Sequence, residues 1–313
     1  MILSLRTLIE LVELKTKLAS LLPFFIGLLF AKSYFGDFNS KNTVIFLIAM
    51  LIFDMATTML NNLMDFIHAK DSKYQSQVNI VGRAHLNPQH VGWAIISMMT
   101  TAAILGIWLT FRTDWLILLA GMACFGIGIF YTFGPLPLSR LPLGEIFSGL
   151  TMGFGITFIA AYINILPEQL LHFYQLSTNW FVQINLSALI ALLLVTVTPI
   201  ASIANIMLAN NLCDYAEDIK NKRHTLPMFL GRQNSLILYQ ILAYGGYFAL
   251  LVGALLGVLK PVILVSFLSL PLIIKITQQF INKQEKATTF NCALKTHVIA
   301  NLSLIIGLSL SLL

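Results

Sequence analysis

Charged side chains and cysteines are scarce in this sequence. Only 10% of its 313 residues are Asp, Glu, Lys or Arg, whereas 58% are hydrophobic. Soluble domains contain about 25% charged and about 45–50% apolar residues, so the composition excludes an ordinary water-soluble domain. Cys124, Cys213 and Cys292 are odd in number and lie in or beside apolar runs. They therefore predict neither a disulfide framework nor a metal site.

A pattern for signal-peptide cleavage is also missing near the N-terminus. Arg6, Lys15 and Lys17 surround a short apolar patch, and no small-residue cleavage pattern precedes the first long apolar run. We therefore expect an interfacial segment that leads into a membrane helix, not a cleaved signal peptide.

Long apolar runs, by contrast, recur along the whole chain. Each is about 20 residues long, enough to cross a hydrocarbon core of about 30 Å as a helix. The sequence predicts an all-α, polytopic membrane bundle of nine transmembrane helices, and residues 1–313 are expected to form a single integral-membrane domain. The predicted helices are centred near Pro23–Phe30, Phe53, Met99, Cys124, Phe154, Leu194, Leu250, Leu268 and Ile305.

The basic residues are unevenly distributed between the two sides of this predicted bundle. If nine helices alternate from the N-terminus, 15 of the 19 Lys and Arg residues lie on one side, and Lys32, Lys41, Arg112 and Lys260 lie on the other. Excess basic charge marks the cytoplasmic face, which predicts a cytoplasmic N-terminus and an external C-terminus in the cell membrane. The same distribution explains the net charge of +6 without nucleic acid as a partner.

The sequence Asn-Asn-Leu-x-Asp occurs twice, each time where an apolar run stops. The first copy is NNLMDFIHAKD, Asn61–Asp71, and the second, 149 residues later, is NNLCDYAED, Asn210–Asp218. In the predicted topology the copies end the second and sixth helices, so both face the same side. This spacing predicts two four-helix halves in parallel repeat plus a ninth helix. Between them, YTFGPLPLSRLPLGE, Tyr131–Glu145, contains three prolines that exclude a continuous helix.

The polar side chains of each motif are spaced to share one helix face. Asn61 and Asp65 are four residues apart, and Asn210, Asp214 and Asp218 repeat that spacing. Carboxylates just inside a membrane boundary are costly and generally face a protein interior or a wet cavity. Two acidic clusters at one depth would repel each other unless a positive charge lies between them, and Mg²⁺ commonly bridges carboxylates and substrate phosphates. We therefore predict a Mg²⁺–diphosphate site at the cytoplasmic mouth of the bundle, for a phosphorylated lipid.

The candidate residues fall into two groups. The predicted catalytic and metal-binding carboxylates are those of the motifs, with two asparagines as further metal ligands: Asp65, Asp71, Asp214, Asp218, Asn61 and Asn210. Candidate contacts to the diphosphate are these asparagines and the residues Lys15, Lys73, Arg83, Arg140, Lys222, Arg223 and Tyr131. For the basic residues a role in topology alone is the alternative. Asp54 is either a buried structural carboxyl or a base for the second substrate.

The two motifs resemble the paired aspartate-rich motifs of the UbiA superfamily of intramembrane aromatic prenyltransferases, and the similarity covers essentially the whole chain. The wide gap between Asp65 and Asp71, YTFGPLP…LGE and the later KRHTLP resemble the branch that prenylates 1,4-dihydroxy-2-naphthoate in menaquinone synthesis. The chain departs from the family before the first helix. The family often has Arg-Pro-Lys-Thr there, and only Lys15 and Thr16 of Glu13-Leu14-Lys15-Thr16 match it.

The resemblance implies transfer of a polyprenyl chain from an allylic diphosphate to an aromatic acceptor, with Mg²⁺ as cofactor. For 1,4-dihydroxy-2-naphthoate the product would be of the demethylmenaquinone type, formed with loss of CO2 and diphosphate. The alternatives are the same chemistry on 4-hydroxybenzoate, haem, a glycerol phosphate or a related quinone precursor. An alternative of another class is a secondary transporter, although transporter sites usually lie near the bilayer midplane in broken helices.

Overall fold

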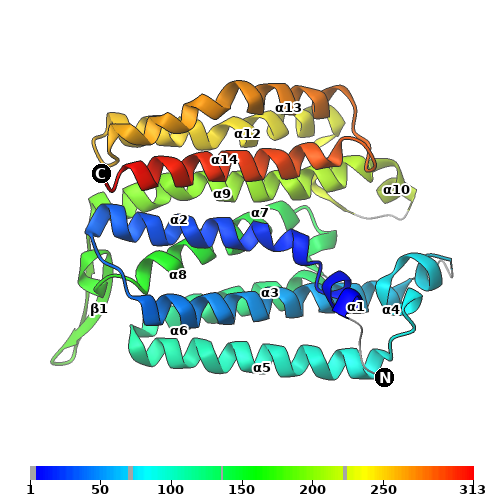
Figure 1. The fold of residues 1–313 in the computed structure, drawn as a ribbon, viewed down its shortest axis with the longest axis horizontal. Helices are drawn as coiled ribbons and strands as arrows, with labels where there is room; N and C mark the ends of the chain where they lie inside the picture. The colour runs from blue at the N-terminus through cyan, green and yellow to red at the C-terminus, as the bar shows by residue number, and fades with distance from the viewer. Residues whose placement is uncertain (1–4, 70–72, 135–136, 221–223) are drawn as a thin grey trace. The chain divides into compact units, whose positions relative to one another are not determined.

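The computed structural model describes residues 5–69, 73–134, 137–220 and 224–313 (Figure 1). Within these ranges nine helical segments are long and apolar enough to cross a membrane, which confirms the predicted number and all nine predicted centres. The segments are Leu18–Phe35, Ser40–His68, Pro88–Arg112, Trp115–Thr132, Gly144–Tyr162, Leu186–Cys213, Arg232–Leu255, Pro261–Asn282 and Phe290–Leu310. The described part of the first motif, residues 61–69, lies at the end of the second segment, and the second motif begins at the end of the sixth.

The first compact unit consists of the described residues of Met1–Ser20 and Val44–Pro137. Its elements are α1 (Leu5–Leu11), the 3-10 helix η1 (Leu14–Lys17), most of α3 (Ser40–His68), the π-helical turn η2 (Tyr74–Val78), α4 (Ile80–Arg83), α5 (Pro88–Arg112) and α6 (Trp115–Thr132).

A hydrophobic cluster in this unit packs the N-terminal segment against the end of α3. It joins Leu11 and Val12 to Met59, Leu60 and Leu63 of α3, and continues to α4 and α5. The first motif is therefore on a helix end that is buried on one side and polar on the other.

The second unit consists of the described residues of Leu21–Thr43 and Leu138–Leu313. It begins with most of α2 (Leu18–Phe35), η3 (Leu138–Arg140), α7 (Gly144–Ser148), the π-helical segment η4 (Gly149–Gly155), α8 (Ile156–Tyr162) and η5 (Pro167–Gln169). It continues with α9 (Leu186–Cys213), α10 (Tyr215–Lys220), α11 (Leu226–Leu230), α12 (Arg232–Leu255), η6 (Pro261–Ser269), α13 (Leu270–Asn282) and α14 (Phe290–Leu310). The break predicted between Tyr131 and Glu145 is confirmed, because α6 ends at Thr132 and α7 begins at Gly144.

Helix α9 is the centre of the second unit. It packs against α7, η4, α12 and α14, and Figure 1 shows α9, α12, α13 and α14 running side by side. Glycines allow close approaches to α9: a Cβ on Gly153 would lie 2.5 Å from the nitrogen of Ile200, and one on Gly246 would lie 2.5 Å from Thr198 Oγ1. Small residues at such positions bring helix backbones together and so promote packing in a membrane.

The all-α prediction is confirmed, and a β-hairpin lies in the connection between α8 and α9. Its strands β1 (Leu171–Leu176) and β2 (Asn179–Ile184) pair antiparallel. Ser177 in the turn adopts a left-handed conformation with φ of 58°. The segments HFYQL and NWFVQI are rich in the aromatic and β-branched residues that favour strands, and the turn between them closes a hairpin.

Candidate functional site

The first motif lies in the last turns of α3, with Asn61 and Asp65 one helical turn apart. Asn61 Oδ1 accepts a hydrogen bond of 3.2 Å from Thr132 Oγ1, at the end of α6. The neighbouring Tyr131 is half-buried in the same turn of α6, and Asp65 is half-buried on α3. Within the first unit, the end of α3 that carries Asn61 is therefore in contact with the end of α6, through Thr132, the residue after Tyr131.

Asn62 serves a different purpose from Asn61. Its Nδ2 donates to the backbone oxygen of Leu11 at 3.1 Å, and its backbone oxygen accepts from Asn79 Nδ2 at 3.0 Å. Asn79 also caps α4 by accepting from the backbone nitrogen of Val81. Asn62 therefore connects α3 by hydrogen bonds to Leu11 in the N-terminal segment and to Asn79, which precedes α4.

Among the candidate diphosphate-binding cations of the first unit, the structure describes the side chains of Arg83 and Lys73. Arg83 Nη2 pairs with Glu10 Oε2 at 2.5 Å, and the Arg83 side chain is 51% exposed. Lys73 is exposed. Lys15 lies in η1, but its side chain is outside the described part of the structure, as is Asp71 altogether.

The second motif runs across the joint between α9 and α10. Asn210 lies in the last turn of α9, Asp214 is the residue that follows its end, and the backbone nitrogen of Asp218 donates to the oxygen of Asp214 at 2.9 Å. Asn210 Nδ2 lies 3.5 Å from Asp214 Oδ2. The helical spacing of the motif is therefore continued beyond the end of α9.

A cation from another part of the second unit contacts this motif. Lys286 Nζ lies 2.6 Å from Asn210 Oδ1 and 2.6 Å from Asp214 Oδ2, and 5.7 Å from the centre of the Phe290 ring. In the sequence, Lys286 is only one of the 15 basic residues predicted on one membrane side. No local pattern could have assigned it to the motif, because it is 72 residues from Asp214.

Asp218 has different surroundings from Asp214. Its side chain is buried, at 2% exposed, and Oδ2 accepts a hydrogen bond of 3.1 Å from Thr225 Oγ1. Thr225 belongs to KRHTLP, one of the segments on which the family resemblance rests. Two of the candidates, Lys222 and Arg223, lie outside the described residues, and the side chain of Arg140 does too.

Glu145, which is not among the predicted site residues, contacts the neighbour of Asn210. Its Oε1 accepts a hydrogen bond of 2.8 Å from Asn211 Nδ2, and both side chains are buried. Glu145 Oε2 is buried without a hydrogen-bond partner among the described residues. The pair fixes the end of α9 to α7, one residue away from Asn210.

The oxygens of the second motif suit a hard cation. Asn210 Oδ1 and Asp214 Oδ2 already converge on one positive charge, the Lys286 ammonium. Mg²⁺ is bound through one or two carboxylates, with waters and substrate phosphates as its other ligands. In the described part of the chain, no group of three or more His, Cys, Asp or Glu side chains could hold a metal ion. A metal ion bound by Asn210 Oδ1 and Asp214 Oδ2 would therefore need further ligands from the substrate, from water or from other parts of the chain.

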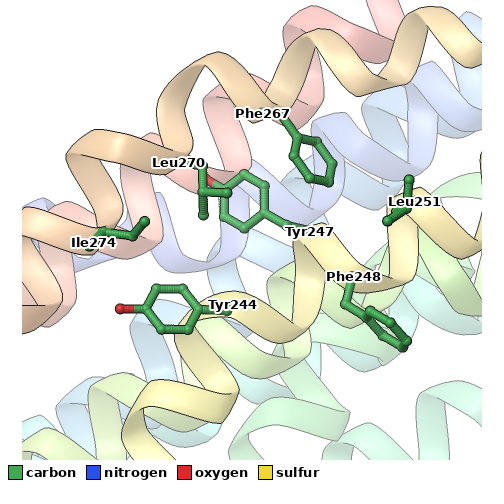
Figure 2. Close-up of a pocket in the computed structure, with 7 residues that line it drawn as sticks. All are labelled: Tyr244, Tyr247, Phe248, Leu251, Phe267, Leu270 and Ile274. Atoms are coloured by element: carbon green, nitrogen blue, oxygen red, sulfur yellow. The ribbon is translucent and has the colours of Figure 1, made fainter.

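A separate apolar groove of about 470 Å³ lies elsewhere in the second unit (Figure 2). Helix α12 contributes four of its lining residues and the segment η6–α13 contributes three: Tyr244, Tyr247, Phe248, Leu251, Phe267, Leu270 and Ile274. The lining side chains are aliphatic or aromatic, so the groove is lined mostly by carbon. The Tyr247 hydroxyl forms a hydrogen bond of 2.7 Å with Ser269 Oγ, which is not a lining residue. None of the candidate site residues is among these seven.

Nine apolar helices in the described ranges, two of which end in an Asn-Asn-Leu-x-Asp motif, are typical of a polytopic membrane protein. Residues 20–302 match the model of the UbiA prenyltransferase family. The chain therefore belongs to the UbiA prenyltransferase family, as its motifs indicated, and is a UbiA-type prenyltransferase.

Individual relatives agree with this assignment. The chain is 26% identical, over 276 residues, to the 1,4-dihydroxy-2-naphthoate octaprenyltransferase of Bacillus subtilis (strain 168), covering 86% of this chain and 80% of the relative. A UbiA homologue from Archaeoglobus fulgidus, bound to GPP and Mg²⁺, has a similar fold with a TM-score of 0.64, 15% identity and coverage of 98% and 99%. The apo structure of a UbiA homologue from Aeropyrum pernix K1 gives a TM-score of 0.68, 17% identity and coverage of 93% and 98%.

Proposed function

We propose that this protein transfers a polyprenyl chain from an allylic diphosphate to 1,4-dihydroxy-2-naphthoate. The observation that carries the proposal is the convergence of Asn210 Oδ1 and Asp214 Oδ2 on one positive charge, in a motif that the chain repeats at Asn61 and Asp65. The choice of acceptor is supported by the Bacillus subtilis relative and by the motif spacing that resembles the naphthoate branch.

Mg²⁺ is the proposed cofactor, since carboxylate and amide oxygens are the ligands it prefers in proteins. The residues that would hold it are Asp65, Asp71, Asp214, Asp218, Asn61 and Asn210. When bound, Mg²⁺ supplies Lewis-acid neutralisation of the diphosphate leaving group. The homologue bound to GPP and Mg²⁺ supports this choice of metal.

The basic side chains near the motifs are proposed to bind the diphosphate oxygens that a metal does not reach, through charge-assisted hydrogen bonds. They are Lys15, Lys73, Arg83, Arg140, Lys222 and Arg223, with the Tyr131 hydroxyl as an additional donor. Arg83 would exchange its exposed partner Glu10 for phosphate, an exchange of small cost because exposed ion pairs contribute only about 0–1 kcal/mol.

In the proposed reaction, a C–O bond of the allylic diphosphate is replaced by a C–C bond to the aromatic acceptor. The allylic C–O bond breaks and its electron pair leaves with the diphosphate, and the electron-rich ring then forms a C–C bond to the allylic carbon. On 1,4-dihydroxy-2-naphthoate the alkylated carbon loses CO2 and the ring regains its aromaticity, which gives a demethylmenaquinone-type product in its reduced, dihydroxy form. The apolar spans exclude water that would otherwise capture the allylic cation, and aromatic rings can stabilise such a cation.

The proposed orientation of the protein in the cell membrane follows from its basic residues. The excess of Lys and Arg on one side favours a cytoplasmic site, a cytoplasmic N-terminus and an external C-terminus. We further propose that residues 1–313 act as one integral-membrane prenyltransferase domain, because the family match covers parts of both compact units.

Purified protein in lipid vesicles, supplied with a labelled allylic diphosphate and one acceptor at a time, tests the proposal. With 1,4-dihydroxy-2-naphthoate we expect a prenylated product whose mass shows the loss of CO2. A product from 4-hydroxybenzoate alone would overturn the acceptor and leave the reaction class intact. No product from any acceptor, in the presence of Mg²⁺, would contradict the proposed reaction itself.

A further inference from the structure

Lys286 occupies the point on which the second motif converges. Its ammonium donates to Asn210 Oδ1 and to Asp214 Oδ2, each at 2.6 Å. These are the two oxygens that the proposed function assigns to a metal ion. The connection between α13 and α14 that carries Lys286 contains no residue of either motif.

An ammonium and a metal ion cannot share this position. A Mg²⁺ ion binds oxygen at about 2.0–2.1 Å, so an ion held by the same two oxygens would be almost in contact with Nζ. Like charges this close repel each other strongly, and most strongly where water is scarce. Metal binding therefore requires Lys286 to leave the motif.

The loop around Lys286 allows the side chain to leave while the backbone stays in place. Glu285 organises the loop: its backbone nitrogen donates to Thr289 Oγ1 at 2.9 Å, and its carboxylate pairs with Lys283 at 2.9 Å. The hydrogen bonds from Lys283 and Thr288 hold the pKa of Glu285 below its ordinary value, so this carboxylate keeps its charge. Lys286 itself is 51% exposed and is attached by a flexible four-carbon stem.

We propose that Lys286 is a substitute cation: in the metal-free protein its ammonium neutralises the second motif, and a metal ion must displace it in order to bind. The inference rests on the proposed function, because it takes Asn210 and Asp214 as metal ligands. It explains how Asp214 is tolerated at the C-terminal end of α9, where the helix dipole disfavours a negative charge.

The consequence is a protein that binds divalent metal weakly until diphosphate is present. Without diphosphate, the metal competes with an ammonium that is tethered to the motif. With diphosphate, the displaced ammonium gains phosphate oxygens as new partners, which favours the exchange. Metal and diphosphate should therefore bind cooperatively, and Lys286 should be a source of that cooperativity.

Metal affinity measured without any substrate tests this role separately from turnover. The full chain in detergent is titrated with Mn²⁺ alone, and the free ion is followed by electron paramagnetic resonance. Lys286→Met removes the charge and retains the apolar stem, so Mn²⁺ should bind about fivefold more tightly than to the unaltered protein, the size expected for the loss of one half-exposed ion pair. Lys286→Arg restores a cation and should bind Mn²⁺ as the unaltered protein does.

Two further variants separate failure of the inference from failure of the proposed function. Lys283→Met removes a neighbouring cation that pairs with Glu285 and should leave the Mn²⁺ affinity unchanged. Asp214→Ala should bind Mn²⁺ at least about tenfold more weakly if the motif holds metal. Equal or weaker binding by Lys286→Met, with loss of binding by Asp214→Ala, would overturn the role of Lys286 alone. Unchanged binding by Asp214→Ala would contradict the metal site of the proposed function.

Discussion

Lys17 and Asp54 form an ion pair inside the first unit, with Lys17 Nζ 2.7 Å from Asp54 Oδ1. The ammonium also donates to Thr58 Oγ1 at 2.6 Å, and Ser20 Oγ donates to Asp54 Oδ2 at 2.6 Å. Lys17 is 3% exposed and Asp54 is 15% exposed. Of the two roles predicted for Asp54, these contacts favour the buried structural carboxyl, which joins the start of α2 to the middle of α3.

Replacing one partner of this pair should destabilise the protein strongly. Lys17→Met leaves the buried Asp54 carboxylate without its opposite charge, with the Ser20 hydroxyl still donating to it, and removal of one partner of a buried pair costs about 3–5 kcal/mol. The double variant Lys17→Met with Asp54→Leu should recover part of that loss, because no unpaired charge remains. Thermal unfolding in detergent measures both variants. A single variant as stable as the unaltered protein would show that the pair contributes little.

Removal of one motif carboxylate should stop product formation while the protein still folds. In Asp65→Ala and Asp214→Ala, the charge stabilisation of the leaving diphosphate is lost, and turnover should fall by at least about 100-fold. Asp37→Ala, in the connection between α2 and α3, is the matched control and should retain turnover. Product yield per mole of folded protein is the measurement. Unaltered turnover by either motif variant would remove that residue from the site.

Chelation of divalent metal should abolish activity reversibly. EDTA removes the ion that the motif oxygens are proposed to hold, so no prenylated product should form until Mg²⁺ is added in excess. Product mass and rate, before and after the addition of Mg²⁺, measure the effect. Full activity in metal-free buffer with EDTA would contradict a metal-dependent reaction.

The contact between α9 and α12 provides a paired test of packing. Gly246→Ala adds a Cβ 2.5 Å from Thr198 Oγ1 and 2.9 Å from Thr198 Cα, so the helices must separate and the melting temperature should fall. Overpacking of this kind typically costs about 1–3 kcal/mol. Gly245→Ala, at the adjacent position, meets no atom within 4 Å and should leave the melting temperature unchanged or slightly raised. Equal melting temperatures for the two variants would contradict this close contact.

Features that depend on local sequence were predicted well. The nine spans follow from the length and polarity of apolar runs, because a helix must satisfy its own backbone hydrogen bonds in lipid. The ends of α3 and α9 follow from the motifs, and the break after α6 follows from the prolines. The hairpin Leu171–Ile184 was not predicted, although its adjacent aromatic residues, Phe173 with Tyr174 and Trp180 with Phe181, favour strands.

Features that depend on residues far apart in sequence could not be predicted. Lys17 with Asp54, Glu145 with Asn211, and Lys286 with Asp214 are separated by 37, 66 and 72 residues. Lysine is common beside membrane helices as a topology determinant, so neither Lys17 nor Lys286 stands out in the sequence.

The sequence by itself determined the nine segments of the described chain that are long and apolar enough to cross a membrane, and the Asn-x-x-x-Asp spacing at the ends of two of them. Those properties follow from hydropathy and helical spacing, which act over short distances along the chain. Only the tertiary structure decided that Lys286 reaches Asn210 and Asp214 and that Thr225 reaches Asp218. The physical reason is that a buried or partly buried charge takes whichever partner the packing of helices brings within hydrogen-bonding distance.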